Sequence, residues 1–174
     1  MSCSKYIGCW LSRTLIETGS AKGDGIQYAL NAGFQMVFSI EIDPAYYEHC
    51  VKRFQGNGRV ILMQGDSKEI LPEILAKTNE PVTILLDAHV TGPNQKHGEK
   101  LCPVIDELKA IIDHSKSDQG KNLRHIIVID DINWLDGKQE WYGNISVKDI
   151  KNTLKDSGYE ITEQTKRYCV IQRL

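Results

Sequence analysis

Apolar and polar positions follow two different rhythms along this chain. Short runs rich in β-branched residues, typical of buried strands, are separated by stretches in which apolar residues recur every three or four positions, as in amphipathic helices. The short runs predict seven strands, at Thr14–Glu17, Met36–Ile42, Val60–Gln64, Val82–Asp87, His125–Asp130, Tyr159–Gln164 and Tyr168–Gln172.

The stretches between the strands predict helices on both faces of one sheet. The last two strands are separated by a gap too short for a crossover, so we expect them to form an antiparallel hairpin. The pattern therefore predicts an α/β fold with a doubly wound, mostly parallel seven-stranded sheet that ends in this hairpin. The helices are expected at Gly25–Ala32, Ala45–Phe54, Lys68–Lys77, Leu101–Ile112 and Val147–Ser157.

Length and charge narrow the class of protein. A chain of 174 residues suits one domain over residues 1–174. With 21 basic and 23 acidic residues, its net charge of −2 provides no large positive field, so we expect no nucleic-acid partner. The five cysteines form no CxxC pair, which predicts reduced thiols in the cytoplasm. We find no signal peptide and no long apolar run, and therefore expect no membrane partner.

A glycine-rich segment, Glu17–Gly25, directly follows the first predicted strand. Glycines at this point let the backbone pass close to a ligand and present the N–H groups of the next helix. Their spacing differs from the Gly-x-Gly-x-x-Gly of dinucleotide sites. This difference argues against a nicotinamide-dependent oxidoreductase, which stays a less favoured alternative function. An ordinary glycine-rich turn that leads into a helix remains the other interpretation.

Acidic residues also lie at the tip of the second predicted strand and just after the third. Glu41 lies roughly 20 residues beyond the glycine-rich segment, where a pair of ribose hydroxyls needs an acceptor. The third strand leads into Gly65, Asp66 and Ser67. Asp66 can also cap the following helix, as can Asp43 ahead of its own helix, and the two roles are compatible.

The fourth and fifth predicted strands end in Asp87 and in the pair Asp130 and Asp131. Neighbouring strands lie about 4.8 Å apart, so these carboxylates repel one another unless a proton or a cation compensates them. Carboxylate oxygens suit Mg2+, and we therefore predict a metal site at Asp87, Asp130 and Asp131. Because adjacent strand residues face opposite ways, both members of the pair can contribute only if the chain leaves the strand at Asp131.

The segment Glu17–Gly25 resembles the first motif of class I S-adenosylmethionine-dependent methyltransferases, acid-x-Gly-x-Gly-x-Gly, with Ala21 in place of the middle glycine. The resemblance extends from Thr14 to the final hairpin and implies a Rossmann-like methyltransferase fold with S-adenosylmethionine as cofactor. It implies that Glu17 meets the methionine end of the cofactor and that an acidic or polar residue at Asp66 meets the adenine amino group. The full set of expected cofactor contacts is Glu17, Gly19, Ser20, Ala21, Gly23, Glu41, Ile42, Asp66, Ser67 and Asp87.

The acids after the fourth and fifth strands resemble those of small metal-dependent O-methyltransferases of the macrocin and catechol types. This resemblance implies methyl transfer to a hydroxyl of a small molecule or sugar, assisted by Mg2+, which lowers the pKa of the hydroxyl. Asp87 and His89 are the catalytic candidates, with His89 as the base or merely as a polar loop residue. The alternative for the acids is one cofactor contact from Asp87 and capping by Asp130 and Asp131.

Recognition of the acceptor is expected to fall to the loops Val90–Lys100 and Ile132–Asn144, because few residues precede the first strand. The second loop carries Trp134, Trp141 and Tyr142, which can cover a ring or sugar face or form the contact of a homo-oligomer. A non-catalytic module that binds S-adenosylmethionine is the remaining alternative function.

Overall fold

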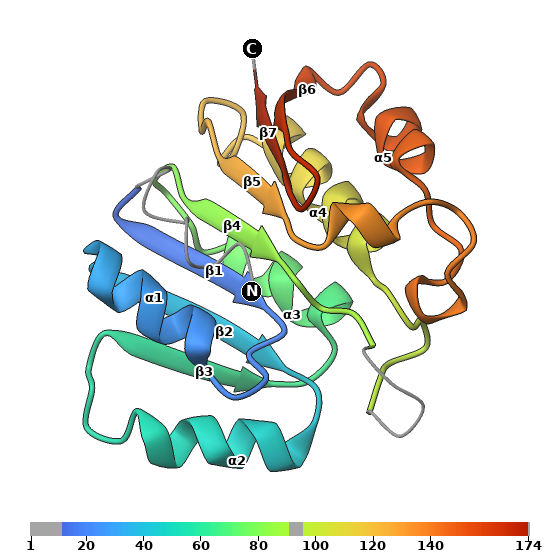
Figure 1. Ribbon diagram of the computed structural model, residues 1–174. Coiled ribbons are helices and arrows are strands. Elements are labelled where there is room, and N and C mark those ends of the chain that lie inside the picture. The colour runs from blue at the N-terminus through green and yellow to red at the C-terminus, as the bar shows by residue number, and fades with distance from the viewer. Residues whose placement is uncertain (1–11, 91–95, 174) are drawn as a thin grey trace.

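One sheet lies between two layers of helices (Figure 1). The computed structural model describes residues 12–90 and 96–173. Cys3, Cys9 and part of the loop Val90–Lys100 therefore lie outside the described residues. Within the described part of the chain, no helix is both long and apolar enough to cross a bilayer.

The sheet has seven strands in the order β3-β2-β1-β4-β5-β7-β6. β1 to β5 pair in parallel, and β7 lies antiparallel between β5 and β6. This arrangement confirms the predicted fold class. Because the strand order reverses between β1 and β4, the ends of these two strands open toward a common edge, where α/β sheets of this kind bind ligands. The strands are β1 (Thr14–Thr18), β2 (Met36–Glu41), β3 (Val60–Gln64), β4 (Thr83–Leu86), β5 (Ile126–Ile129), β6 (Tyr159–Gln164) and β7 (Cys169–Arg173).

Helices cover both faces of the sheet, as the alternation of patterns predicts (Figure 1). The fourth helix begins at Val104 rather than at Leu101, because Pro103 lies just ahead of it as the N-cap residue. Two short 3-10 helices, η2 (Ile132–Trp134) and η3 (Glu140–Tyr142), lie where a plain loop is expected. The α-helices are α1 (Asp24–Ala32), α2 (Pro44–Arg53), α3 (Ser67–Leu75), α4 (Val104–Lys116) and α5 (Val147–Leu154).

The central strands are buried on both faces, because successive side chains point to opposite sides. Leu15 and Val37 belong to the apolar cluster under α1 and α2. Ile16 and Ile40 belong to the larger cluster under α3, α4 and α5. Burial of this kind fixes the register of the strands and, with it, the positions of the polar residues that follow them.

Candidate functional site

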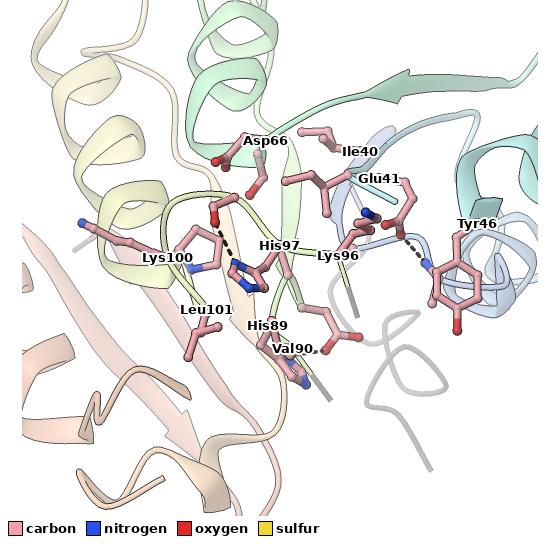
Figure 2. Close-up of a pocket in the computed structure, with 18 of the residues that line it drawn as sticks. Ile40, Glu41, Tyr46, Asp66, His89, Val90, Lys96, His97, Lys100 and Leu101 are labelled. Atoms are coloured by element: carbon pink, nitrogen blue, oxygen red, sulfur yellow. Dashed lines mark hydrogen bonds and ion pairs between the residues drawn. The ribbon is translucent and has the colours of Figure 1, made fainter. Parts of the chain in front are cut away.

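A cavity of about 230 Å³ lies beyond the carboxyl ends of β2, β3, β4 and β5 (Figure 2). The turn after β1 forms one wall, and the segment Lys96–Leu101 crosses the opposite side. Most of the residues predicted from the sequence meet here. Those that line the cavity are Gly19, Ala21, Glu41, Ile42, Asp66, Ser67, Asp87, His89, Asp130 and Asp131.

The turn after β1 is packed tightly against the end of β4. Gly19 has φ +82°, and a Cβ atom added there would lie 2.6 Å from the backbone oxygen of Asp87. A larger residue at position 19 would therefore be strained and would also push the turn away from β4. The Gly19 N–H donates to the Ile40 carbonyl at 2.9 Å, so the turn is held from the β2 side as well.

Glu41 ends β2 and faces the cavity, although only 5% of its surface is exposed. Oε2 accepts a hydrogen bond from the Ala21 N–H at 2.7 Å, and Oε1 accepts one from the Asp43 N–H at 2.8 Å. Burial raises the pKa of Glu41, and these backbone hydrogen bonds partly oppose the shift. A carboxylate oxygen has two lone pairs, so Glu41 can still accept a pair of hydroxyls.

Glu17, Ser20 and Gly23 lie behind the turn rather than along the cavity, which differs from the expected cofactor contacts. Glu17 is 2% exposed, and its Oε2 accepts from the Ser39 hydroxyl at 2.6 Å. Ser39 also pairs with the Ser20 hydroxyl at 2.6 Å, and Gly23 packs against the Phe54 ring. Burial raises the pKa of Glu17 to about 8. Glu17 therefore supports the turn from below.

Asp66 both caps α3 and lines the cavity. Its Oδ1 accepts from the Lys68 N–H at 3.1 Å, which confirms the helix cap, and its side chain also lines the cavity. The backbone of Gly98 lies directly against it, since a Cβ atom added at Gly98 would be 2.0 Å from Asp66 Oδ2. An ion pair of 2.7 Å between Lys68 and Glu99 ties this crossing segment to α3. Sequence patterns gave no sign of this contact.

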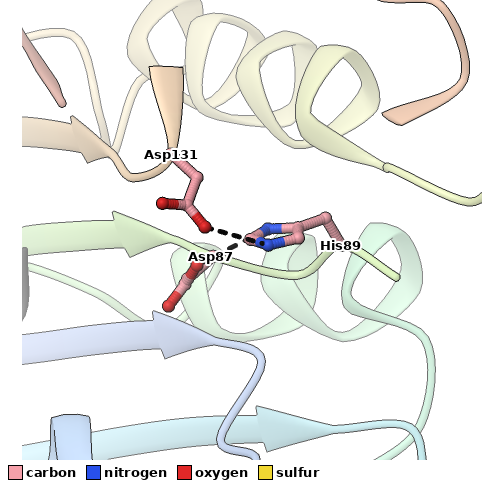
Figure 3. Close-up of side chains that lie close together, drawn as sticks. All are labelled: Asp87, His89 and Asp131. Atoms are coloured by element: carbon pink, nitrogen blue, oxygen red, sulfur yellow. Dashed lines mark ion pairs between the residues drawn. The ribbon is translucent and has the colours of Figure 1, made fainter. Parts of the chain in front are cut away.

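A second group forms where β4 and β5 end (Figure 3). The His89 ring lies between two carboxylates, with Nδ1 3.5 Å from Asp87 Oδ1 and Nε2 3.4 Å from Asp131 Oδ2. Tyr142 stacks on this ring at 4.5 Å between centroids and donates to Asp131 Oδ2 at 3.3 Å. These contacts fix the orientation of His89 beside the cavity.

The carboxylates of this group differ in their ionisation. Burial, and after it the charge of Asp130, raises the pKa of Asp87 well above its usual range. For Asp131, burial alone would raise the pKa, but hydrogen bonding and attraction to His89 and the charge of Arg167 lower it overall. Burial therefore disfavours the charged form of Asp87, whereas the charged form of Asp131 is stabilised by its neighbours.

Arg167 is a functional candidate that sequence reasoning missed. It lies in the turn between β6 and β7, lines the cavity, and pairs with Asp130 at 3.2 Å and with Asp131 at 2.8 Å. The register of β7 contained the missing signal. Ile129 pairs with Cys169 in antiparallel fashion, so two residues beyond the pair, Asp131 must lie near Arg167.

The expected metal site at Asp87, Asp130 and Asp131 is therefore not the group that the structure assembles. Asp130 faces Arg167, and the three side chains whose ligand atoms lie within 4.8 Å of one another are Asp87, His89 and Asp131. Mg2+ requires near-octahedral oxygen ligands and usually keeps several waters. Carboxylates already engaged by a guanidinium and an imidazole do not fit that requirement.

Comparison with known proteins identifies the fold of the chain. No protein-family model matches it, and no curated protein does. An SAH-bound methyltransferase from Podospora anserina is 12% identical, with a TM-score of 0.64 over 97% of this chain and 74% of that one. An O-methyltransferase from Bacillus cereus in complex with SAH is 14% identical, with a TM-score of 0.63 over 98% and 80% of the two chains.

A pre-rRNA processing protein, fibrillarin from Methanococcus jannaschii, has the same architecture. It is 15% identical to this chain, with a TM-score of 0.55 over 93% of this chain and 66% of that one. At such low identity, these likenesses establish the methyltransferase-type fold and leave the activity to be argued from the site.

Proposed function

We propose that this protein binds S-adenosylmethionine and transfers its methyl group to a hydroxyl of a small molecule or sugar. One observation carries the proposal: Glu41, Asp66 and Asp87, at or just beyond the ends of β2, β3 and β4, line the same cavity. These acids come from strand ends at which ligands bind in folds of this kind. Structures of two methyltransferases with the same fold contain SAH, the product of such a transfer, which supports the choice of cofactor.

When bound, S-adenosylmethionine supplies a methyl group attached to a positively charged sulfur. Glu41 would accept the ribose hydroxyls, and Asp66 with Ser67 would meet the edge of the adenine ring. Asp87 is suited to a cationic ligand, because a positive charge nearby stabilises an anion that burial disfavours. Gly19 and Ala21 would form the wall beneath the cofactor.

His89 would act as the base that removes the proton of the acceptor hydroxyl, which is a weak nucleophile until it loses that proton. Asp131 faces Nε2 and would hold the tautomer that leaves Nδ1, on the side of Asp87, to receive the proton. The imidazolium that results lies between two carboxylates, so it is stabilised where it forms. Mg2+ has no part in this mechanism, because the donor set does not fit it.

The acceptor class rests on charge and on exposed aromatic residues. Trp134 and Trp141 are 47% and 44% exposed on η2, which follows Asp131, and on η3, which contains Tyr142, and they are suited to stacking on a ring or sugar. A net charge of −2 favours a small molecule over an RNA, although one protein of this fold processes pre-rRNA. We also propose a single domain over residues 1–174, a cytoplasmic location and a homo-oligomeric contact through the aromatic segment Ile132–Asn144.

Calorimetry with S-adenosylmethionine, S-adenosylhomocysteine and NAD tests the cofactor. The first two should bind and NAD should not. Glu41→Gln should weaken S-adenosylmethionine binding by at least about tenfold, because a hydrogen bond to a charged group contributes roughly 1.5–3 kcal/mol. Glu48→Gln, an exposed position on α2, is the matched control. Binding of NAD alone, or equal affinities in both variants, would refute the proposal. Binding without turnover on any hydroxyl acceptor would favour the non-catalytic module.

A further inference from the structure

The guanidinium of Arg167 meets both acids that follow β5. Nε lies 3.2 Å from Oδ1 of Asp130, and Nη2 lies 2.8 Å from Oδ1 of Asp131. The Asp130 side chain is 1% exposed, whereas that of Arg167 is 36% exposed and lines the cavity. The positive charge of Arg167 therefore lies against a buried carboxylate in the wall of the cavity.

The backbone at Asp131 is shaped for this double contact. Asp131 has φ +54°, a left-handed conformation that residues other than glycine adopt only occasionally. Its N–H donates to Asp130 Oδ1 at 2.8 Å. Two consecutive strand residues would face opposite sides of the sheet, and this conformation instead turns both carboxylates toward Arg167.

The second oxygen of Asp131 is also engaged. Oδ2 faces His89 Nε2 at 3.4 Å and accepts from the Tyr142 hydroxyl at 3.3 Å. The His89 ring presents Nδ1 to Asp87 and Nε2 to Asp131 (Figure 3). One ligand atom from each of these three side chains lies within 4.8 Å of the others, so an ion bound there would compete with His89 and Tyr142 for Asp131 Oδ2.

A guanidinium and a divalent cation compete for the Oδ1 atoms of Asp130 and Asp131. Arg presents a planar fork of N–H donors that matches carboxylate oxygens, and its charge is permanent. Mg2+ or Mn2+ would need oxygen ligands at roughly 2.0–2.2 Å, in the space that the guanidinium now fills. Any ion that joins Asp130 to Asp131 must first displace Arg167.

We propose that Arg167 takes the place of a divalent cation in this site. It neutralises Asp130 and Asp131 and fixes Asp131 against His89, so it is a positioning residue for the base. This catalytic role rests on the proposed function, whereas the exclusion of metal does not. The methyl transfer then requires no metal.

Titration with Mn2+, followed by electron paramagnetic resonance, tests the exclusion of metal without any turnover. Wild-type protein should bind no Mn2+ at this site up to about 1 mM, whereas Arg167→Met leaves acids uncompensated and should create a site at least roughly tenfold tighter. Arg167→Lys keeps a positive charge and should still exclude the ion. Arg53→Met removes an exposed arginine that pairs with Asp24 and should behave as wild type.

The Mn2+ titrations decide whether Arg167 excludes a divalent cation. A wild-type site that binds Mn2+ and loses it in Asp131→Asn would overturn the proposal, and so would a folded Arg167→Met protein without new Mn2+ affinity. If Arg167→Met does not fold, the wild-type and Arg167→Lys titrations still decide. For the catalytic part, methyl transfer should be unchanged by EDTA. The Arg167→Lys protein should keep the wild-type affinity for S-adenosylmethionine but should lose turnover.

If no hydroxyl acceptor is methylated, the proposed function fails while the Mn2+ result stands. If methylation occurs and EDTA abolishes it, the proposed function survives and the role of Arg167 is refuted. The two failures are therefore distinguishable.

Discussion

Glu41 holds the turn that follows the neighbouring strand, because its Oε2 accepts a 2.7 Å hydrogen bond from the Ala21 N–H. Ala21 has φ +44°, a conformation rare for residues other than glycine. Glu41, which we propose binds the cofactor, thus also holds the turn that forms one wall of the cavity. Glu41 preorganises the wall of the cavity before any ligand arrives.

Hydrogen exchange should reveal this contact in the Glu41→Ala variant. The Ala21 amide loses its acceptor and should exchange much faster than in wild type, since local protection depends on that hydrogen bond. The Gly19 amide donates to the backbone of Ile40 and should stay protected, which makes it an internal control. Equal protection of both amides in the variant would show that Glu41 does not hold the turn.

Gly25 and Glu17 form a second pair that can be tested by a double-mutant cycle. A Cβ atom added at Gly25 would lie 1.7 Å from Glu17 Oε1. Gly25→Ala should therefore destabilise the wild type by about 1–3 kcal/mol, as overpacking does. In the Glu17→Ala background, Gly25→Ala should instead stabilise the protein by about 1 kcal/mol, because Gly25 lies within α1 and alanine favours a helix more than glycine does.

Urea unfolding of the four proteins measures this cycle. Gly58→Ala is the control, because nothing lies within 4 Å of a Cβ atom added there. It should have the same effect in both backgrounds. If Gly25→Ala costs equal stability with and without Glu17, the close approach of helix and carboxylate is wrong.

The sequence predicted the fold well where burial controls the pattern. The predicted runs Met36–Ile42 and Val82–Asp87 contain β2 (Met36–Glu41) and β4 (Thr83–Leu86), most of whose residues are buried. The caps at Asp43 and Asp66 are also confirmed, because capping depends on residues two positions away. Local signals of this kind need no knowledge of the tertiary structure.

Side-chain partners across the sheet were harder to predict. Arg167 lies in an exposed turn, and its contact with Asp130 spans 37 residues, so it appears only once the register of β7 is known. Glu17 has the motif position of a ligand contact, yet its strand position turns it beneath the loop. Glu107 lies within the predicted helix Leu101–Ile112 and is only 1% exposed, with a pKa raised to about 7 by burial. Patterns of hydrophobicity do not tell which carboxylates are buried.

The buried carboxyl of Glu17 predicts a specific pH dependence of stability. Burial, with further contributions from Glu41 and Asp24, raises its pKa from 4.5 to about 8, against the hydrogen bond from Ser39. The folded state therefore holds a proton that the unfolded chain releases. This stabilisation is complete below about pH 4.5 and is lost as the pH rises through about 8.

Glu17→Gln removes this titration, so the variant should gain stability relative to wild type as the pH rises from 5 to 9, by about 1.4 kcal/mol per pH unit at most. Urea midpoints at several pH values measure the difference. Buried acids that do not interact with Glu17, such as Glu107, titrate alike in both proteins and cancel. Glu48→Gln, at an exposed position, should run parallel to wild type. A constant difference between Glu17→Gln and wild type would mean that Glu17 is ionised in the fold.

His89 separates catalysis from cofactor binding. His89→Gln should lower the turnover of a hydroxyl acceptor by roughly 10²–10⁴-fold, the usual contribution of a positioned base. The affinity for S-adenosylmethionine should persist, because Glu41 and Asp66 are untouched. The measurement is formation of S-adenosylhomocysteine with catechol, hexose and nucleoside hydroxyls as probe acceptors, and calorimetry gives the affinity. His49→Gln is the control, since His49 is exposed on α2. If His89→Gln turns over at the wild-type rate, another group removes the proton, and the imidazole between Asp87 and Asp131 serves only to hold the two strand ends together.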